Sequence, residues 1–123
     1  MILKIKEYGF KINIVDKYEI KLGEEIYLKR LGENPEIKII PTKISEDSLE
    51  FNVEGEKKLL NKYNFIQRGK NSFSKQNLTR EGELVKGEVY ILEKGEEICF
   101  AEKSPKQQVF DAVHGYIVSL ENE

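Results

Sequence analysis

Cysteine, histidine and long apolar runs are scarce in this 123-residue chain, and each shortage excludes a class of protein. The one cysteine, Cys99, cannot form a disulfide within the chain, which is usual for proteins of reducing compartments. One cysteine and one histidine cannot supply the four ligands of a structural zinc site, and we expect neither a metal nor a cofactor. Lys4 and Lys6 interrupt the apolar start of the chain, so we expect no secretory signal there.

Alanine and arginine are also rare, with alanine only at Ala101 and Ala112 and arginine only at Arg30, Arg68 and Arg80. Lysine, isoleucine and asparagine, whose codons are AT-rich, are common instead, which suggests a bacterial or phage genome of that composition. Because alanine is the best helix former, its scarcity also favours strands over helices.

The overall composition is that of a small globular protein. Apolar residues make up 39% of the chain, which is enough for one core, and we expect a single all-β domain over 1–123. The 20 basic residues nearly balance the 22 acidic ones, unlike the composition of a disordered chain or of a general polyanion binder. No stretch reaches the roughly 18 apolar residues of a membrane-spanning helix, so we expect a cytoplasmic protein without membrane contact.

Apolar and polar residues alternate along most of the chain, which is typical of strands that bury one face. The segments that we expect to be extended are 10–14, 18–22, 26–31, 37–44, 49–53, 71–78, 89–92, 98–101 and 116–120. Pro41 should bend its strand or place it at an edge, because proline cannot donate to a ladder. The strand over 89–92 has apolar residues in succession and should be buried on both faces.

Turn residues separate these segments. Asp16 and Lys17 should form a turn, and a hairpin connection is expected at 23–25. A second, tight hairpin is expected at 93–96, where Gly95 supplies the positive φ that such a turn demands.

Two segments have helical features. The spacing of apolar residues over 56–63 predicts a short helix, and Ser104 followed by Pro105 predicts the start of a helix over 104–115. The predicted fold is therefore mainly β, an antiparallel β-sandwich or barrel of about eight to ten short strands with one or two short helices.

The common catalytic motifs G-x-S-x-G, H-E-x-x-H and C-x-x-C are absent. A nucleophile and its base could come only from Cys99 and His114, with Asp111 as the group that orients the imidazole. Cys99 lies in an apolar strand segment, however, where a free cysteine usually packs as an inert residue. We therefore expect a protein that is not an enzyme, and a Cys/His-dependent enzyme stays as an alternative.

The charges are unevenly distributed along the chain. Residues 57–80, the basic segment, contain seven Lys or Arg and no Asp or Glu, whereas residues 81–102, the acidic segment, carry a net charge of −5. Aromatic and amide side chains are interleaved with the cations, as in surfaces that bind phosphates and stack on bases. The residues expected to contact an anionic partner are Lys62, Tyr63, Arg68, Lys70, Phe73, Lys75 and Arg80.

These features lead to two main hypotheses about function. The first is a non-catalytic binding protein that docks a nucleotide, a nucleic acid or an acidic protein surface on the basic segment. The second is an accessory protein that antagonises another protein, such as an immunity protein, an inhibitor or a phage protein directed against its host. The basic and acidic segments of two copies could also pair in a homodimer, or the two segments could neutralise each other within one chain.

Overall fold

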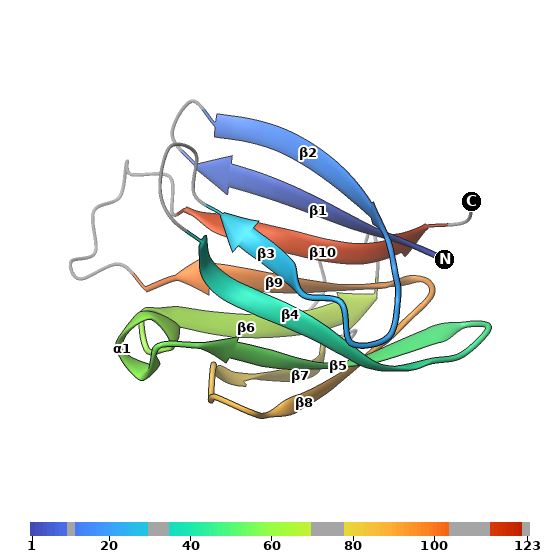
Figure 1. The fold of residues 1–123 in the computed structure, drawn as a ribbon. Helices are drawn as coiled ribbons and strands as arrows, with labels where there is room; N and C mark the ends of the chain where they lie inside the picture. Colours follow the sequence, from blue (N-terminus) through green and yellow to red (C-terminus); the bar gives the residue numbers. More distant parts are fainter. Residues whose placement is uncertain (10–11, 30–34, 70–77, 104–113, 122–123) are drawn as a thin grey trace.

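The computed structural model describes residues 1–9, 12–29, 35–69, 78–103 and 114–121 (Figure 1). These residues form ten strands and one helix of a single turn, α1 (Lys57–Leu60). The strands are β1 (Ile2–Gly9), β2 (Ile12–Glu19), β3 (Ile26–Lys29), β4 (Pro35–Ile44), β5 (Ser48–Gly55), β6 (Tyr63–Gly69), β7 (Leu78–Glu83), β8 (Val89–Glu93), β9 (Glu96–Glu102) and β10 (Gly115–Glu121). The mainly-β class predicted from the sequence is confirmed.

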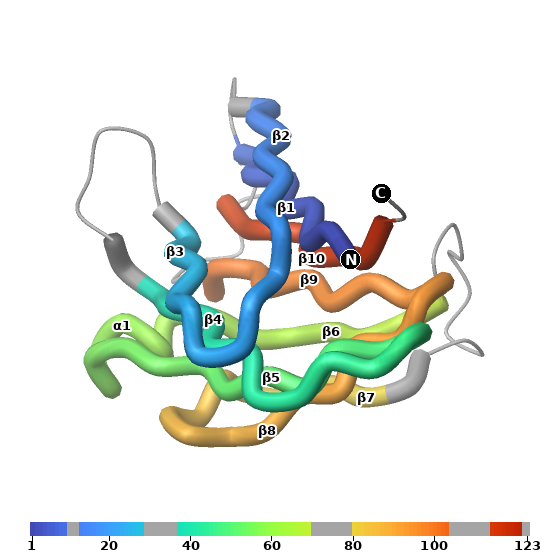
Figure 2. The backbone as a smooth tube through the Cα atoms, turned by 45° about the vertical axis from the view of Figure 1, so that its right-hand side comes forward, coloured from blue at the N-terminus to red at the C-terminus, as the bar shows by residue number. Residues whose placement is uncertain are grey.

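The strands are arranged in two antiparallel sheets. Six strands form the larger sheet in the order β2-β1-β10-β9-β6-β7, and four form the smaller sheet in the order β3-β4-β5-β8. The smaller sheet lies across one face of the larger one (Figure 1, Figure 2). Strand β7 is an edge strand of the larger sheet and β8 is an edge strand of the smaller one. No hydrogen-bonded ladder joins these two edges within the described ranges, so the fold is an open sandwich and not a barrel.

The core lies between the two sheets and follows from the alternation of the strands. In β1 the side chains of Leu3 and Ile5 are buried, and in β5 those of Leu49, Phe51 and Val53 are buried, with more exposed residues between them. Strands such as these turn their apolar faces to the opposite sheet, and the packing of the two sheets supplies most of the favourable free energy of folding.

The ring of Tyr90 in β8 joins the two sheets. It stacks on Phe51 of its own sheet, with 5.6 Å between centroids. It also meets Phe65 and Phe100 of the larger sheet edge-on, at 5.0 and 6.2 Å. Aromatic pairs of this geometry stabilise beyond the area that they bury, so this cluster holds β8 close to β6 and β9.

Two predicted hairpins are turns that carry the chain from one sheet to the other. Gly95 has a φ of 86° and lies in a tight turn, which confirms the turn at 93–96. The predicted pairing across it is wrong, because β8 pairs with β5 whereas β9 pairs with β6 and β10. The connection at 23–25 likewise joins β2 of the larger sheet to β3 of the smaller one. Both strands at such a turn bury their apolar faces by folding over the core, which a flat hairpin would not achieve.

Polar and proline residues interrupt the strands less than the sequence suggests. The predicted turn at Asp16 and Lys17 is wrong, because β2 runs through both residues and pairs with β1, a strand that the alternation had not revealed. Both side chains are exposed at the sheet edge, where a strand tolerates them. The predicted bend at Pro41 is confirmed as a register shift between Pro41 and Lys43 in β4.

Strand β8 is not buried on both faces, contrary to the prediction. Tyr90 and Leu92 face the core, but Val89 and Ile91 are exposed. The reason is the position of β8 at the edge of the smaller sheet, whose outer face no other described strand covers.

The helix predicted over 56–63 is confirmed in shortened form as α1, which buries Leu60 and is followed by β6 from Tyr63. Of the second predicted helix, residues 104–113 lie outside the described residues, and Gly115 begins β10. The strand predicted over 71–78 also lies outside them except for Leu78, where β7 begins. No helix in the part of the chain that the structure describes is long and apolar enough to cross a bilayer.

Candidate functional site

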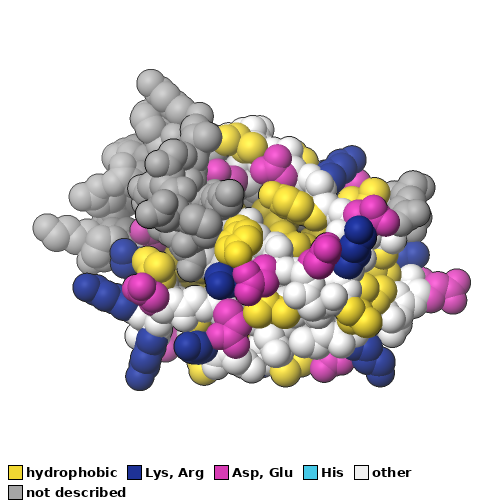
Figure 3. All heavy atoms as spheres, viewed as in Figure 1, with side chains coloured by type: hydrophobic (Ala, Val, Ile, Leu, Met, Phe, Trp, Pro, Cys, Tyr) yellow, Lys and Arg dark blue, Asp and Glu magenta, His cyan; other side chains and the backbone are white. Residues whose placement is uncertain are grey.

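The acidic segment neutralises the two described arginines of the basic segment. The Arg68 Nε lies 3.2 Å from the Glu97 Oε1, across neighbouring positions of β6 and β9. Arg80 forms an ion pair with Glu88. On the face seen in Figure 3, basic and acidic side chains are interspersed and no large patch of one sign is visible. The uneven charge along the sequence is therefore partly balanced in space.

The structure does not bring the expected binding residues together on one surface. Tyr63 is only 2% exposed and packs against the rings of His114 and Tyr116, so its faces are closed to a ligand. Arg68 and Arg80 lie on opposite faces of the larger sheet, because Arg80 pairs in register with Gln67, the neighbour of Arg68.

Lys62 is exposed directly after α1, where its carbonyl accepts a hydrogen bond of 2.6 Å from the Lys103 N–H. Lys70, Phe73 and Lys75 lie outside the described residues. Arg80 is thus the expected binding residue around which a site can be described.

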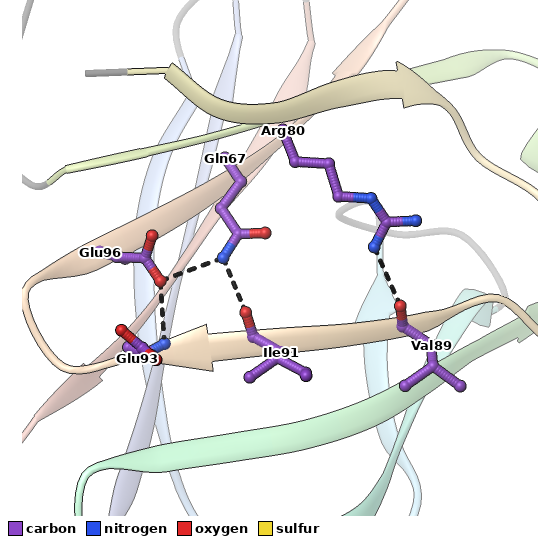
Figure 4. Close-up of a pocket in the computed structure, with 6 residues that line it drawn as sticks. All are labelled: Gln67, Arg80, Val89, Ile91, Glu93 and Glu96. Carbon is purple, nitrogen blue, oxygen red and sulfur yellow. Dashed lines mark hydrogen bonds between the residues drawn. The ribbon is translucent and has the colours of Figure 1, made fainter.

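Arg80 borders a pocket of about 360 Å³ at the open side of the sandwich (Figure 4). The lining residues come from four strands and are Gln67 of β6, Arg80 of β7, Val89, Ile91 and Glu93 of β8, and Glu96 of β9. The pocket therefore lies where the edge of the smaller sheet approaches the edge of the larger one.

Side chains, and not a strand, occupy the outer edge of β8. The Arg80 Nη1 donates to the Val89 carbonyl at 3.0 Å, and the Gln67 Nε2 donates to the Ile91 carbonyl at 2.7 Å (Figure 4). In an antiparallel strand the N–H and C=O of one residue point to the same side, and alternate residues point to opposite sides. Val89 and Ile91 therefore direct their backbone groups away from β5 and toward the pocket.

Glu96 completes this arrangement. Its Oε1 accepts hydrogen bonds from the Gln67 Nε2 at 3.1 Å and from the Glu93 backbone N–H at 3.2 Å. Gln67 is only 4% exposed, so its amide is fixed between the two sheets. Side chains thus form hydrogen bonds with the outward backbone groups of three alternate residues of β8, Val89, Ile91 and Glu93.

The guanidinium of Arg80 is held in place by aromatic rings. It lies 5.2 Å from the centroid of Phe65 and 5.1 Å from that of Tyr90. The Tyr90 hydroxyl donates to Glu88 at 3.2 Å, and burial, followed by the charge of Glu88, raises the pKa of that hydroxyl above its ordinary value. These contacts fix the position of the guanidinium. Because the Arg80 side chain is still 40% exposed, solvent or a partner can reach its N–H groups.

The local charge is negative despite Arg80. Glu88 pairs with the guanidinium, and Glu93 and Glu96 line the same pocket. A phosphate there would meet three carboxylates for one cation, which like-charge repulsion disfavours.

The structure also keeps the conceivable nucleophile and base apart. Cys99 contacts the Tyr8 hydroxyl at 3.1 Å, whereas the His114 Nε2 lies 2.7 Å from the Glu7 Oε2. Glu7 and Tyr8 are consecutive in β1, so their side chains point to opposite faces of the sheet. Burial raises the pKa of the Cys99 thiol, which favours the unreactive protonated form. Asp111 lies outside the described residues.

Sequence reasoning missed Gln67 and the buried pair of Glu7 and His114. A signal existed for Gln67, since Tyr63, Phe65 and Gln67 alternate and predict a strand with the amide on its inner face. The pairing of Glu7 with a residue more than a hundred positions away had no such local signal. Within the described ranges, no group of three or more His, Cys, Asp or Glu side chains is placed to hold a metal ion.

Comparison of the chain with protein-family models, with curated proteins and with solved structures finds no match.

Proposed function

We propose that the protein is a cytoplasmic, non-catalytic interaction protein that binds an extended segment of a partner protein along the outer edge of β8. The observation that carries the proposal is the pair of hydrogen bonds from Arg80 and Gln67 to the carbonyls of Val89 and Ile91. A sheet edge without a neighbouring strand is a template on which another strand can pair. A partner strand would take the place of these two side chains at the carbonyls of Val89 and Ile91.

Exposed apolar side chains beside this edge support a protein partner. Val85, Val89 and Ile91 are all exposed, and Ile91 is 51% exposed. A rigid arginine next to exposed apolar residues is typical of the centre of a protein interface. The added strand would cover these side chains with every second residue of its own.

The charges favour a polypeptide over a nucleic acid at this edge. Glu88 pairs with Arg80, and Glu93 and Glu96 line the other end of the same pocket, so a polyanion would be repelled. A single carboxylate or a backbone carbonyl of the partner can still accept from the guanidinium, which has further N–H groups beyond those bonded to Val89 and Glu88. The proposal therefore narrows the anionic partner expected from the sequence to a protein segment.

The experiment selects random linear peptides displayed on phage against the wild-type protein and measures the affinity of the selected peptides in synthetic form. Ile91→Pro removes an outward N–H but no hydrogen bond to β5. It should weaken binding by at least about tenfold, because the added strand loses one bond and meets the proline ring.

Two control variants accompany this measurement. Ile91→Thr keeps the N–H and the β-branched shape, and it should retain most of the affinity. Leu22→Glu changes an apolar side chain that is 62% exposed elsewhere and should have no effect. Circular dichroism establishes that each variant folds. Peptides that bind Ile91→Pro as tightly as the wild type, or that respond to Leu22→Glu instead, would contradict the proposal.

A second candidate function is the docking of an anionic partner beside α1. Lys57, Lys58 and Lys62 are exposed, and no ion pair joins them to another residue in the described ranges. The wild type, the three variants above and Lys62→Glu are each measured for binding to a single-stranded oligonucleotide. Binding that falls steeply with salt and is lost in Lys62→Glu supports this candidate, and absence of binding at low salt removes it.

A further inference from the structure

We propose that two copies of this chain associate through the outer faces of their six-stranded sheets, which are the faces turned away from the smaller sheet. This inference is independent of the β8 edge, because it concerns a different face of the molecule. It also replaces the homodimer predicted from the sequence, in which the basic segment of one copy pairs with the acidic segment of the other. Arg68 and Arg80 already have their partners, Glu97 and Glu88, within one chain.

One row of side chains crosses the outer face from edge to edge of the sheet. In strand order from β2 to β7 it consists of Val15, Lys6, Ile117, Cys99, Ile66 and Glu81. The row belongs to the outer face, because the chain neighbours Ile5, Ile98 and Val118 are buried in the core.

The middle of this row is apolar. Ile117, Cys99 and Ile66 are half-buried on neighbouring strands, and Val15 at the edge is 46% exposed. In the adjacent row the ring of Tyr8 lies over Gly115, and its hydroxyl contacts the Cys99 sulfur at 3.1 Å, so the tyrosine ring extends the apolar surface beside these residues. An antiparallel sheet with one face toward water normally places polar residues on that face. An apolar surface in this position is therefore suited to a second layer of protein.

Opposite charges mark the two ends of the apolar stretch. Lys6 lies on one side of it and Glu81 on the other, and neither forms an ion pair with another residue of the described ranges. In contrast, Lys4 and Lys17 on the same face both pair with Glu121, at 3.5 and 2.9 Å. Lys6 and Glu81 are thus available to a second molecule that presents the complementary charge at the matching position.

A second copy presents that arrangement. In the order β1-β10-β9-β6-β7, strand β9 is the middle strand. A twofold axis parallel to the strands and above β9 places each Lys6 opposite the Glu81 of the second copy. The same axis places Ile117 opposite Ile66, and it passes over Cys99, whose sulfur contacts the Tyr8 hydroxyl. Because packed sheets are about 10 Å apart, side chains that face each other in this way are in contact.

The available area predicts a weak dimer. Five strands spaced at about 4.8 Å span about 24 Å, and three rows of side chains extend about 20 Å along them, which gives roughly 500 Å² per copy. A stable interface usually buries about 800 Å² per partner. The association should therefore depend on concentration and on the two pairs of charges.

The experiment measures the molar mass by sedimentation equilibrium over a range of protein concentrations. Lys6→Glu and Glu81→Lys should each weaken the association by at least about tenfold, because each change places like charges opposite one another twice in the dimer. An equimolar mixture of the two variants should associate as well as the wild type, because in the mixed pair both contacts again join opposite charges. Lys21→Glu, in an exposed connection outside the face, is the matched control and should have no effect.

The inference is overturned if the wild type remains monomeric up to about 1 mM, where even a weak dimer of this kind would be populated. It is also overturned if the mixture of the two charge variants associates no better than either variant alone.

Discussion

Replacing Gly115 by alanine should destabilise the protein by about 2–3 kcal/mol. An added Cβ would lie 2.5 Å from the Tyr8 hydroxyl oxygen and 2.6 Å from the Phe100 carbonyl oxygen. The tyrosine ring can rotate, but the carbonyl belongs to the ladder between β9 and β10, which pairs Gly115 with Ala101. The two strands must therefore separate locally, and this displacement of the backbone accounts for most of the expected loss.

Two other glycines serve as controls for the same chemical change. A Cβ at Gly9 would be 3.6 Å from its nearest neighbour, which is an ordinary contact, and one at Gly82 would be 3.3 Å from a ring carbon of Phe65. The loss of stability should therefore increase from Gly9→Ala through Gly82→Ala to Gly115→Ala. Tyr8→Phe combined with Gly115→Ala should recover only part of the loss, because the contact with the carbonyl remains.

Urea unfolding followed by far-UV circular dichroism measures these differences. A loss of about 2.5 kcal/mol lowers the midpoint by about 1 M, for a dependence on urea of about 2 kcal/mol per M. A stability of Gly115→Ala within about 0.5 kcal/mol of the wild type, the usual range for neutral substitutions, would show that the strands accommodate the added methyl group. Equal losses in Gly9→Ala and Gly115→Ala would show that the close contact at Gly115 is not the cause.

Two further predictions concern ionisable groups. Burial raises the pKa of the Cys99 thiol and of the Tyr8 and Tyr90 hydroxyls, so these groups ionise more readily in the unfolded chain. The free energy of unfolding should therefore be unaffected by these groups below about pH 8 and fall as the pH rises further, and a flat profile from neutral to strongly alkaline pH would refute this. Glu7→Leu leaves the buried N–H of His114 without its acceptor and should cost about 2 kcal/mol, whereas Glu7→Gln keeps an oxygen acceptor and should cost less than half as much. Equal losses in urea unfolding would show that the hydrogen bond is not the cause.

Local sequence patterns were sufficient to predict the strands whose two faces differ in polarity. Leu49, Phe51 and Val53 alternate with polar residues, and β5 buries those three side chains. The tight turn at Gly95 was also predictable, because its φ of 86° is a conformation that glycine adopts without strain. Such features depend on a few consecutive residues and therefore leave a signal in the sequence.

The candidate site could not be predicted from local sequence patterns, because it is formed by contacts between residues of different strands. Arg80 belonged to a run of cations that the sequence presented as an anion-binding face, but it pairs with Glu88 and bonds to the Val89 carbonyl. The role of Gln67 follows from the carbonyl of Ile91, 24 positions later, which reaches it only because β8 lies at the edge of the other sheet.

The amino-acid sequence alone was enough to establish a mainly-β chain of short antiparallel strands, since alternating polarity and glycine turns act over a few residues. The assignment of each strand to its sheet required the folded molecule. Strands β8 and β9 illustrate the difference, because the turn between them was predictable and their separation into two sheets was not. That separation follows from the burial of both apolar faces against one core, a cooperative property of the whole chain. It also leaves the outer edge of β8 and the outer face of the larger sheet without a covering strand in the described structure, and these are the two surfaces where we expect partners to bind.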